Sequence, residues 1–141
     1  MSQQQPTTEE VIRRLQKHGV NPTRQRIDVA RVLFARPQHL SAEEILHSTR
    51  KLGARISKAT VYNTLALFSS KGLVREIIVD PSRVFYDSNP TAHHHFYNID
   101  TGELLDFDAT QLQLRNMPHL PPGTVADGVD VVIRIRNASL Q

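Results

Sequence analysis

Three consecutive histidines, His93 to His95, stand between residues that favour a β-strand. Successive side chains of a strand point to opposite faces, so His93 and His95 share one face while His94 lies on the other. Two imidazoles on one face can bind the same cation. The structural alternatives are a purification tag, which an internal position disfavours, and a solvated surface patch. The functional interpretation is a site for a metal ion or haem.

Carboxylates flank the histidines on both sides, with Asp87 before them and Asp106 after them. The turn-like sequence Asp-Thr-Gly at 100–102 predicts that residues 103–107 fold back as a partner strand, which would bring Asp106 near the face of His93. Imidazole nitrogen and carboxylate oxygen ligands suit manganese, ferrous iron or zinc, and these residue types do not choose among the three.

Composition limits the classes of protein to consider. With 141 residues and 16.0 kDa, the chain can form one ordinary domain or two small ones. No run approaches the roughly 20 apolar residues of a membrane span, and the polar N-terminus resembles no secretory signal. We therefore expect a soluble, cytoplasmic protein without a membrane partner. The sequence has no cysteine, so disulfides, thiolate zinc sites and thiol redox sensing are excluded.

Charge is distributed unevenly along the chain. Residues 1–83 contain 14 Lys and Arg against 7 Asp and Glu, a net charge of +7, whereas residues 84–141 contain 3 against 7, a net charge of −4. A random surface distribution is the plain explanation. The alternative is a basic half that binds nucleic acid, joined to an acidic half that binds a cation.

The basic half has the element order of a winged helix-turn-helix. Capping residues, glycines and helical periodicity predict four helices, and two short strands follow as a hairpin. The third and fourth helices would form the helix-turn-helix, and the hairpin would form the wing. The expected helices span 8–18, from Thr23 to Pro37, from Ser41 to Leu52, and 58–71; the expected strands span 73–79 and 84–87.

The start of the fourth helix would present polar side chains to the major groove. Hydroxyls and the Lys58 ammonium suit phosphates, while Asn63 could pair with an adenine edge. The alternative is a purely structural role, in which Tyr62 packs against neighbouring side chains and Lys58 is only solvated. The candidate DNA contacts are Arg24, Ser57, Lys58, Thr60, Tyr62 and Asn63.

The acidic half predicts only a thin layer of structure. Asp108 would cap a short helix that ends near Asn116, a loop rich in proline would follow, and a last strand would span 129–136. Such a layer needs another surface over its apolar face, and a second copy of the chain can provide one. We therefore predict an α+β protein with a winged-helix domain at 1–87 and a small α/β dimerisation domain at 88–141.

Four stretches carry a resemblance to a known family: GVNPTRQR at 19–26, HLSAE at 39–43, ATVYNTL at 59–65, and the histidine run. Together they resemble the ferric uptake regulator superfamily over nearly the whole chain. ATVYNTL and HHHFY are most similar to its iron response regulator branch, and aspartate rather than glutamate at position 106 is similar to its peroxide regulator branch.

The resemblance implies a homodimeric transcriptional regulator that binds palindromic double-stranded operator DNA. It also implies a regulatory metal site between the domains, with Mn or Fe(II) as the physiological ion and zinc possible in vitro. Carried over by position, its ligands are His39, Asp87, His93, His95 and Asp106. His39 is supplied by the resemblance alone. The regulator is expected to control genes for iron, haem or the response to peroxide stress.

Two departures from the family pattern change these expectations. Most members bind a structural zinc through paired Cys-x-x-Cys motifs, whereas this chain has no cysteine and must hold a dimer without that ion. A histidine-rich accessory site is incomplete, because Ala92 and Gln113 stand where ligands would be expected. His94 remains, and it is a candidate for haem or a second metal. The cysteine-containing haem motif of some iron response regulators is absent.

Two other classes of function compete with a regulator. A small metalloenzyme could use the His and Asp cluster to activate water or oxygen. Against it, no separate general acid or base stands out, and five protein ligands leave little open coordination. A protein that merely coats DNA would leave the histidines unexplained and would bind DNA independently of metal.

Overall fold

The computed structural model describes residues 5–89 and 91–139 and divides the chain into two compact units. Unit 1 is Met1–Pro90 and unit 2 is Thr91–Gln141. The predicted boundary between residues 87 and 88 lies close to this division, and the assignment of DNA binding to one part and dimerisation to the other stays a prediction. In the described part of the chain, no helix is long and apolar enough to span a membrane.

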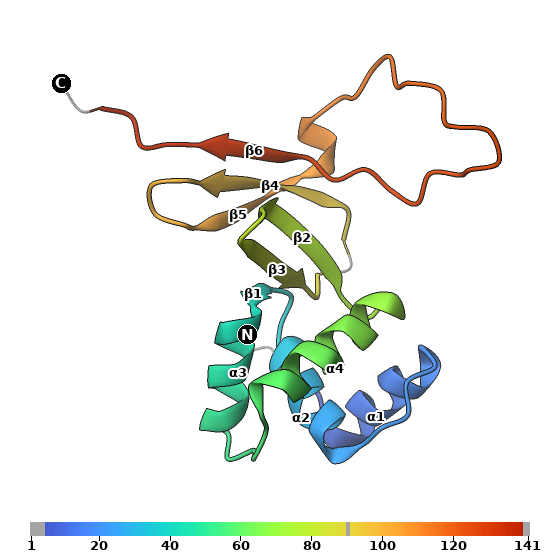
Figure 1. The fold of residues 1–141 in the computed structure, drawn as a ribbon, viewed down its shortest axis with the longest axis vertical. Helices are drawn as coiled ribbons and strands as arrows, with labels where there is room; N and C mark the ends of the chain where they lie inside the picture. The colour runs from blue at the N-terminus through green and yellow to red at the C-terminus, as the bar shows by residue number, and fades with distance from the viewer. Residues whose placement is uncertain (1–4, 90, 140–141) are drawn as a thin grey trace. The chain divides into compact units, whose positions relative to one another are not determined.

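Unit 1 contains the four predicted helices (Figure 1). Each of them begins after a Thr or Ser cap. The predicted capping box is confirmed, because the Glu44 amide donates to Ser41 Oγ at 3.2 Å and the Ser41 amide donates to Glu44 Oε1 at 3.4 Å. The helices are α1 (Thr8–Lys17), α2 (Arg24–Leu33), α3 (Ala42–Lys51) and α4 (Lys58–Ser70).

A three-stranded antiparallel sheet completes unit 1. Strands β2 (Arg75–Asp80) and β3 (Arg83–Asp87) form the predicted hairpin. A third strand, β1 (His39–Ser41), was not predicted, and it pairs with β3 so that the order is β1-β3-β2. Helices followed by this small sheet confirm the winged helix-turn-helix.

The core of unit 1 is made by apolar side chains from all four helices. Leu15, Val29, Ile45 and Phe68 come from α1, α2, α3 and α4 in turn, and each is fully buried. Burying these faces fixes α4 against the other helices, while Lys58, Tyr62 and Asn63 of α4 stay exposed.

Unit 2 is a second three-stranded sheet of order β5-β4-β6. Its strands are β4 (His93–Asn98), β5 (Leu104–Asp108) and β6 (Val132–Ile135). The predicted turn between β4 and β5 is confirmed: the Gly102 amide donates to the Asn98 carbonyl at 2.7 Å, and Gly102 adopts a positive φ of 75°.

Two sequence predictions for unit 2 were wrong in extent. The expected helix from Asp108 to Asn116 is only a 3-10 turn, Ala109–Gln111. Asp108 does cap this turn, but residues 113–130 are exposed, and a short helix without a packed face is marginal in water. The last strand pairs with β4 over four residues rather than the eight expected, and it runs parallel to β4.

Candidate metal centre and nucleic-acid interface

In unit 2, strand pairing brings two histidines and one aspartate together. His95 is the direct cross-strand partner of Asp106, and its Nε2 lies 3.2 Å from Asp106 Oδ1. His93 is on the same face of β4, with Nε2 at 3.9 Å from the same oxygen. The two imidazole rings are 4.7 Å apart at an interplanar angle of 70°. Both histidines are buried, whereas the Asp106 side chain is 38% exposed.

A backbone carbonyl fixes a proton on Nδ1 of the His93 ring. The distance from His93 Nδ1 to the Thr91 carbonyl oxygen is 2.5 Å, and a carbonyl can only accept, so Nδ1 carries the proton in this contact. In the neutral ring, Nε2 then presents a lone pair toward the Asp106 carboxylate. An imidazole lone pair and a carboxylate oxygen can both bind one cation. Metal-binding histidines commonly use their second nitrogen in this way, so the donor set fits a divalent cation.

Unit 1 contains the other two predicted ligands, which lie opposite each other on adjacent strands. His39 on β1 is the register partner of Asp87 on β3. The His39 ring packs edge-on against Phe85 with centroids 6.0 Å apart. The Asp87 carboxylate is buried, and its Oδ1 accepts a hydrogen bond from the Asn89 amide at 2.7 Å. The predicted ligands thus form two sets, each positioned by a strand pair of its own unit.

His94 lies on the opposite face of β4 from the other two histidines. Its ring packs against Phe107 with centroids 5.6 Å apart, and its Nδ1 accepts a hydrogen bond from the Val131 amide at 3.2 Å. The neutral ring therefore carries its proton on Nε2. To bind haem iron through Nε2, the neutral ring would have to move its proton from Nε2 to Nδ1. Nδ1 could then no longer accept the hydrogen bond from the Val131 amide. The haem or second-site role of His94 stays a prediction.

The predicted DNA contacts gather at the N-terminal ends of α2 and α4. Arg24 is the first residue of α2, and Lys58, Tyr62 and Asn63 are exposed on the first two turns of α4. Ser57 caps α4, since its Oγ accepts from the Thr60 amide at 3.1 Å. Its hydroxyl also lies 2.9 Å from that of Thr60. These two hydroxyls therefore shape the helix start, whereas the other four side chains are exposed to solvent.

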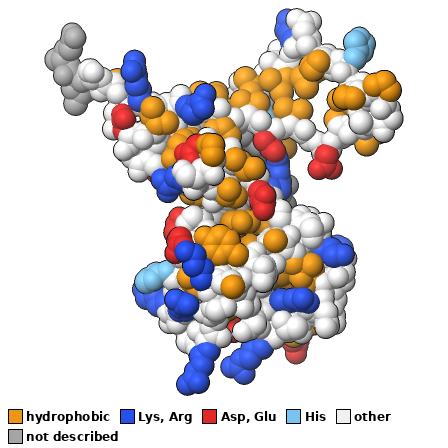
Figure 2. All heavy atoms as spheres, viewed as in Figure 1, with side chains coloured by type: hydrophobic (Ala, Val, Ile, Leu, Met, Phe, Trp, Pro, Cys, Tyr) orange, Lys and Arg blue, Asp and Glu red, His pale blue; other side chains and the backbone are white. Residues whose placement is uncertain are grey.

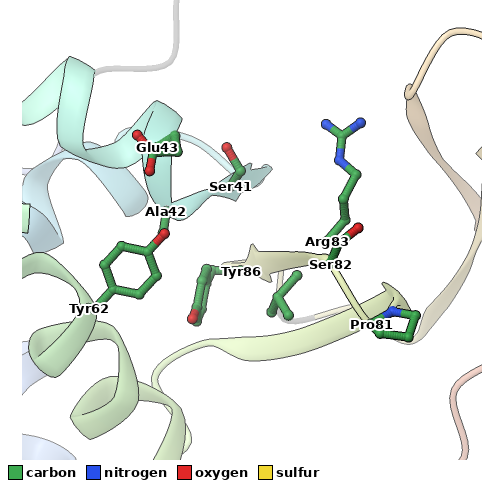
Figure 3. A pocket seen from close by; sticks show the side chains of 9 residues that line it. Ser41, Ala42, Glu43, Tyr62, Pro81, Ser82, Arg83 and Tyr86 are labelled. Atoms are coloured by element: carbon green, nitrogen blue, oxygen red, sulfur yellow. The ribbon is translucent and has the colours of Figure 1, made fainter.

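Glu43, which sequence reasoning missed, holds two of these side chains. Its carboxylate lies 2.9 Å from the Lys58 ammonium, and it also interacts with the side chain of Tyr62. Figure 3 shows Tyr62 reaching from α4 toward the first turn of α3, on the edge of a hollow of about 360 Å³. Hydrogen bonding and charge attraction between Lys58 and Glu43 lower the pKa of the carboxyl and raise that of the ammonium.

No sequence signal would have found this contact. An acidic residue in the first turn of a helix is explained by the helix dipole, and Glu43 stands next to the capping residue Glu44. Its proximity to Lys58 arises from the packing of α3 against α4, which is a tertiary feature.

Comparison with known proteins gives consistent matches. A sequence profile described as the ferric uptake regulator family matches residues 4–119. A peroxide-responsive repressor, PerR, of Staphylococcus epidermidis is 36% identical over 104 residues, which are 74% of this chain and 69% of that protein.

Solved structures extend the likeness to the fold. The ferric uptake regulator of Pseudomonas aeruginosa, solved with manganese, aligns with a TM-score of 0.71 and 26% identity over 89% of this chain and 96% of that one. The ferric uptake regulator of Vibrio cholerae aligns with a TM-score of 0.68 over 89% and 98% of the two chains. At 24% identity, the second match supports the fold alone.

Proposed function

This chain belongs to the ferric uptake regulator family, and we propose on that basis that it is a DNA-binding transcriptional regulator whose affinity for its operator depends on a bound divalent metal. Members of the family regulate transcription, so the small metalloenzyme is excluded. The observation that carries the metal dependence is the convergence of His93, His95 and Asp106 in unit 2.

His and Asp donors suit Mn, Fe(II) and zinc alike; we propose Mn or Fe(II) as the physiological ion, as the family membership implies, with zinc able to occupy the site in vitro. The relative from Pseudomonas aeruginosa, which was solved with manganese, supports this choice. His93, His95 and Asp106 would hold the ion together with His39 and Asp87. A bound cation supplies positive charge that offsets the two carboxylates.

Ligands from both units would make the site a clamp. His39 and Asp87 belong to unit 1, and the other three ligands belong to unit 2. When all five bind one ion, the angle between the units is fixed, and in a dimer this angle sets the spacing of the two α4 helices. One spacing fits two half-sites on DNA, so we expect the metal-bound form to bind the operator more tightly.

A homodimer would cover the apolar side chains that unit 2 leaves in water (Figure 2). Leu105 and Ile133 on the sheet are 40% and 38% exposed, and Leu114, Met117, Leu120 and Val129 are more exposed still. Burying these apolar side chains against a second copy would stabilise a dimer that has no cysteine-bound zinc. The operator DNA would be reached in the bacterial cytoplasm.

Selection of DNA from a random pool tests this function. Duplexes retained by the full chain with Mn²⁺ are sequenced and compared with those retained after chelation. We expect a palindromic sequence, enriched only with metal. Enrichment of the same sequence after chelation would contradict metal dependence, and no enrichment under either condition would contradict the regulator itself.

Replacing Lys58 with methionine should weaken DNA binding similarly for all sequences, because an ammonium attracts phosphates without reading bases. The slope of log affinity against log salt should become shallower by about 0.9 per subunit. Replacing Arg24 should act in the same way. Lys71→Met is the matched control, since Lys71 caps the opposite end of α4. Equal losses for Lys58→Met and Lys71→Met would show that the start of α4 is not the DNA contact.

Replacing Glu43 with glutamine should have the opposite effect. The Lys58 ammonium loses its carboxylate partner and becomes available to a phosphate, so affinity should rise by about two- to five-fold per subunit. The salt dependence should become steeper. Fluorescence anisotropy across a salt series measures both quantities. A weaker affinity would instead mean that Glu43 orients Lys58 toward DNA.

A further inference from the structure

The strand pair that carries His39 and Asp87 continues by one more residue on each side. Gln38 precedes His39, and Ser88 follows Asp87. The Ser88 amide donates to the Gln38 carbonyl at 2.9 Å, and the Gln38 amide donates to Ser88 Oγ at 3.3 Å. The two residues therefore exchange hydrogen bonds immediately beside the two proposed ligands.

The Ser88 side chain has a second role in this arrangement. Its hydroxyl hydrogen can be donated to the Arg36 carbonyl at 3.3 Å or to the Gln38 carbonyl at 3.2 Å. Ser88 is buried, so an unsatisfied partner here would carry a full desolvation cost. The hydroxyl thus joins the end of β3 to the segment that follows α2.

The Gln38 side chain extends the connection into α2 itself. Its Nε2 donates to the Val32 carbonyl at 2.8 Å and to the Leu33 carbonyl at 3.3 Å. These carbonyls belong to the last turn of α2, where the helix offers no amide of its own. Gln38 therefore caps the C-terminal end of α2 while its backbone is held by Ser88.

From these contacts we infer that Gln38 and Ser88 are positioning residues for the metal site, which tie His39 and Asp87 to each other and to the C-terminal end of α2. This inference rests on the proposed function, because it assigns a role to residues behind the proposed ligands. Groups that hydrogen-bond directly to metal ligands typically change metal affinity by about 10- to 100-fold when removed. Gln38 and Ser88 act one residue further away, through the backbone beside the ligands, so we expect the lower end of that range. The same hydrogen bonds connect the ligand strands to α2, the helix that begins at the candidate DNA contact Arg24.

The test compares Ser88→Ala and Gln38→Met with Thr49→Val in the full chain. Thr49 is buried in α3 of the same unit, and its hydroxyl donates to the Ile45 carbonyl at 2.6 Å, so Thr49→Val removes a comparable buried hydrogen bond away from β1 and β3. Mn²⁺ affinity is measured by calorimetry, and thermal unfolding of the metal-free chain is measured in parallel.

We expect all three variants to unfold at a lower temperature than the parent chain. Mn²⁺ affinity should fall by about 10-fold in Ser88→Ala and Gln38→Met, and by less than about two-fold in Thr49→Val. Ser88→Thr keeps the hydroxyl and should restore the affinity. If the first two variants bind Mn²⁺ as tightly as Thr49→Val does, the positioning role is wrong.

A second comparison separates positioning from a general effect on the protein. In chains that already carry both His39→Ala and Asp87→Ala, adding Ser88→Ala should not lower the remaining Mn²⁺ affinity further, because Ser88 acts through those two ligands. An additional loss of ten-fold would contradict the inference. If the parent chain binds no Mn²⁺, the metal function and the positioning role both fall, whereas normal binding by the parent and by Ser88→Ala removes the positioning role alone.

Discussion

Replacing His93 with alanine is expected to lower Mn²⁺ affinity by roughly 100-fold or more. A structural zinc site of four ligands contributes about 10–16 kcal/mol, or about 3 kcal/mol for each ligand, and we take a Mn²⁺ ligand to contribute a similar order of magnitude. His93 should matter this much because the Thr91 carbonyl fixes its ring with Nε2 toward Asp106. The metal-free chain should remain folded. Calorimetry measures the affinity, and circular dichroism of the metal-free chain measures the fold.

The control for this variant is the neighbouring histidine. His94→Ala removes an imidazole from the same strand, but from the opposite face, where the ring accepts from the Val131 amide. We expect Mn²⁺ affinity within about three-fold of the parent chain. Similar losses in the two variants would indicate a general effect on β4 and would contradict the assignment of His93 as a ligand.

The second large effect is expected at Asn63, which is exposed near the start of α4. A carboxamide that pairs with an adenine edge discriminates against other bases by about 1–3 kcal/mol. A dimer on a palindrome uses this contact twice, so Asn63→Ala should reduce operator affinity by at least about 30-fold. Binding to unrelated duplexes should change little, because phosphate contacts are retained. Anisotropy with the selected duplex and with unrelated DNA measures both.

Ser70→Ala provides the matched control for Asn63. Ser70 is also an exposed polar residue of α4, but it lies at the other end of the helix. Its replacement should leave operator affinity unchanged. If Asn63→Ala weakens binding to selected and unrelated duplexes equally, Asn63 does not read a base.

Local sequence signals were sufficient for most of unit 1. Ser41 and Glu44 predicted the start of α3, and the Asp-Pro-Ser-Arg turn at 80–83 predicted the wing hairpin. Both predictions succeeded because each signal acts within a few residues. β1 escaped prediction because three residues are too short to show an alternating pattern. It is a strand because it pairs with β3, which lies more than 40 residues later in the sequence.

Unit 2 shows the limit of periodic patterns. Alternation placed His93 and His95 on one face correctly, and the turn at 100–102 correctly predicted the approach of Asp106. The helix expected after Asp108 failed because a cap starts a turn but does not supply an apolar surface for it. Residues 113–130 have no such surface within unit 2.

The remaining candidate residues required different information. His39 was named as a ligand through a family resemblance, and the structure adds that it is the register partner of Asp87 and packs against Phe85. Glu43, Gln38 and Ser88 carried no sequence signal. Their contacts join segments that are distant in sequence or depend on helix packing, so only the folded chain brings them together.

The most direct test of the central claim is an anaerobic titration of the metal-free chain with Mn²⁺ and Fe²⁺, followed by metal stoichiometry and by anisotropy of the selected duplex in the same samples. A parallel haem titration is followed by absorbance. The account predicts one divalent ion per subunit at the proposed site and a rise in DNA affinity that follows its occupancy, with both lost in His93→Ala. DNA affinity that stays constant while metal binds, or a full response in His93→Ala, would contradict it.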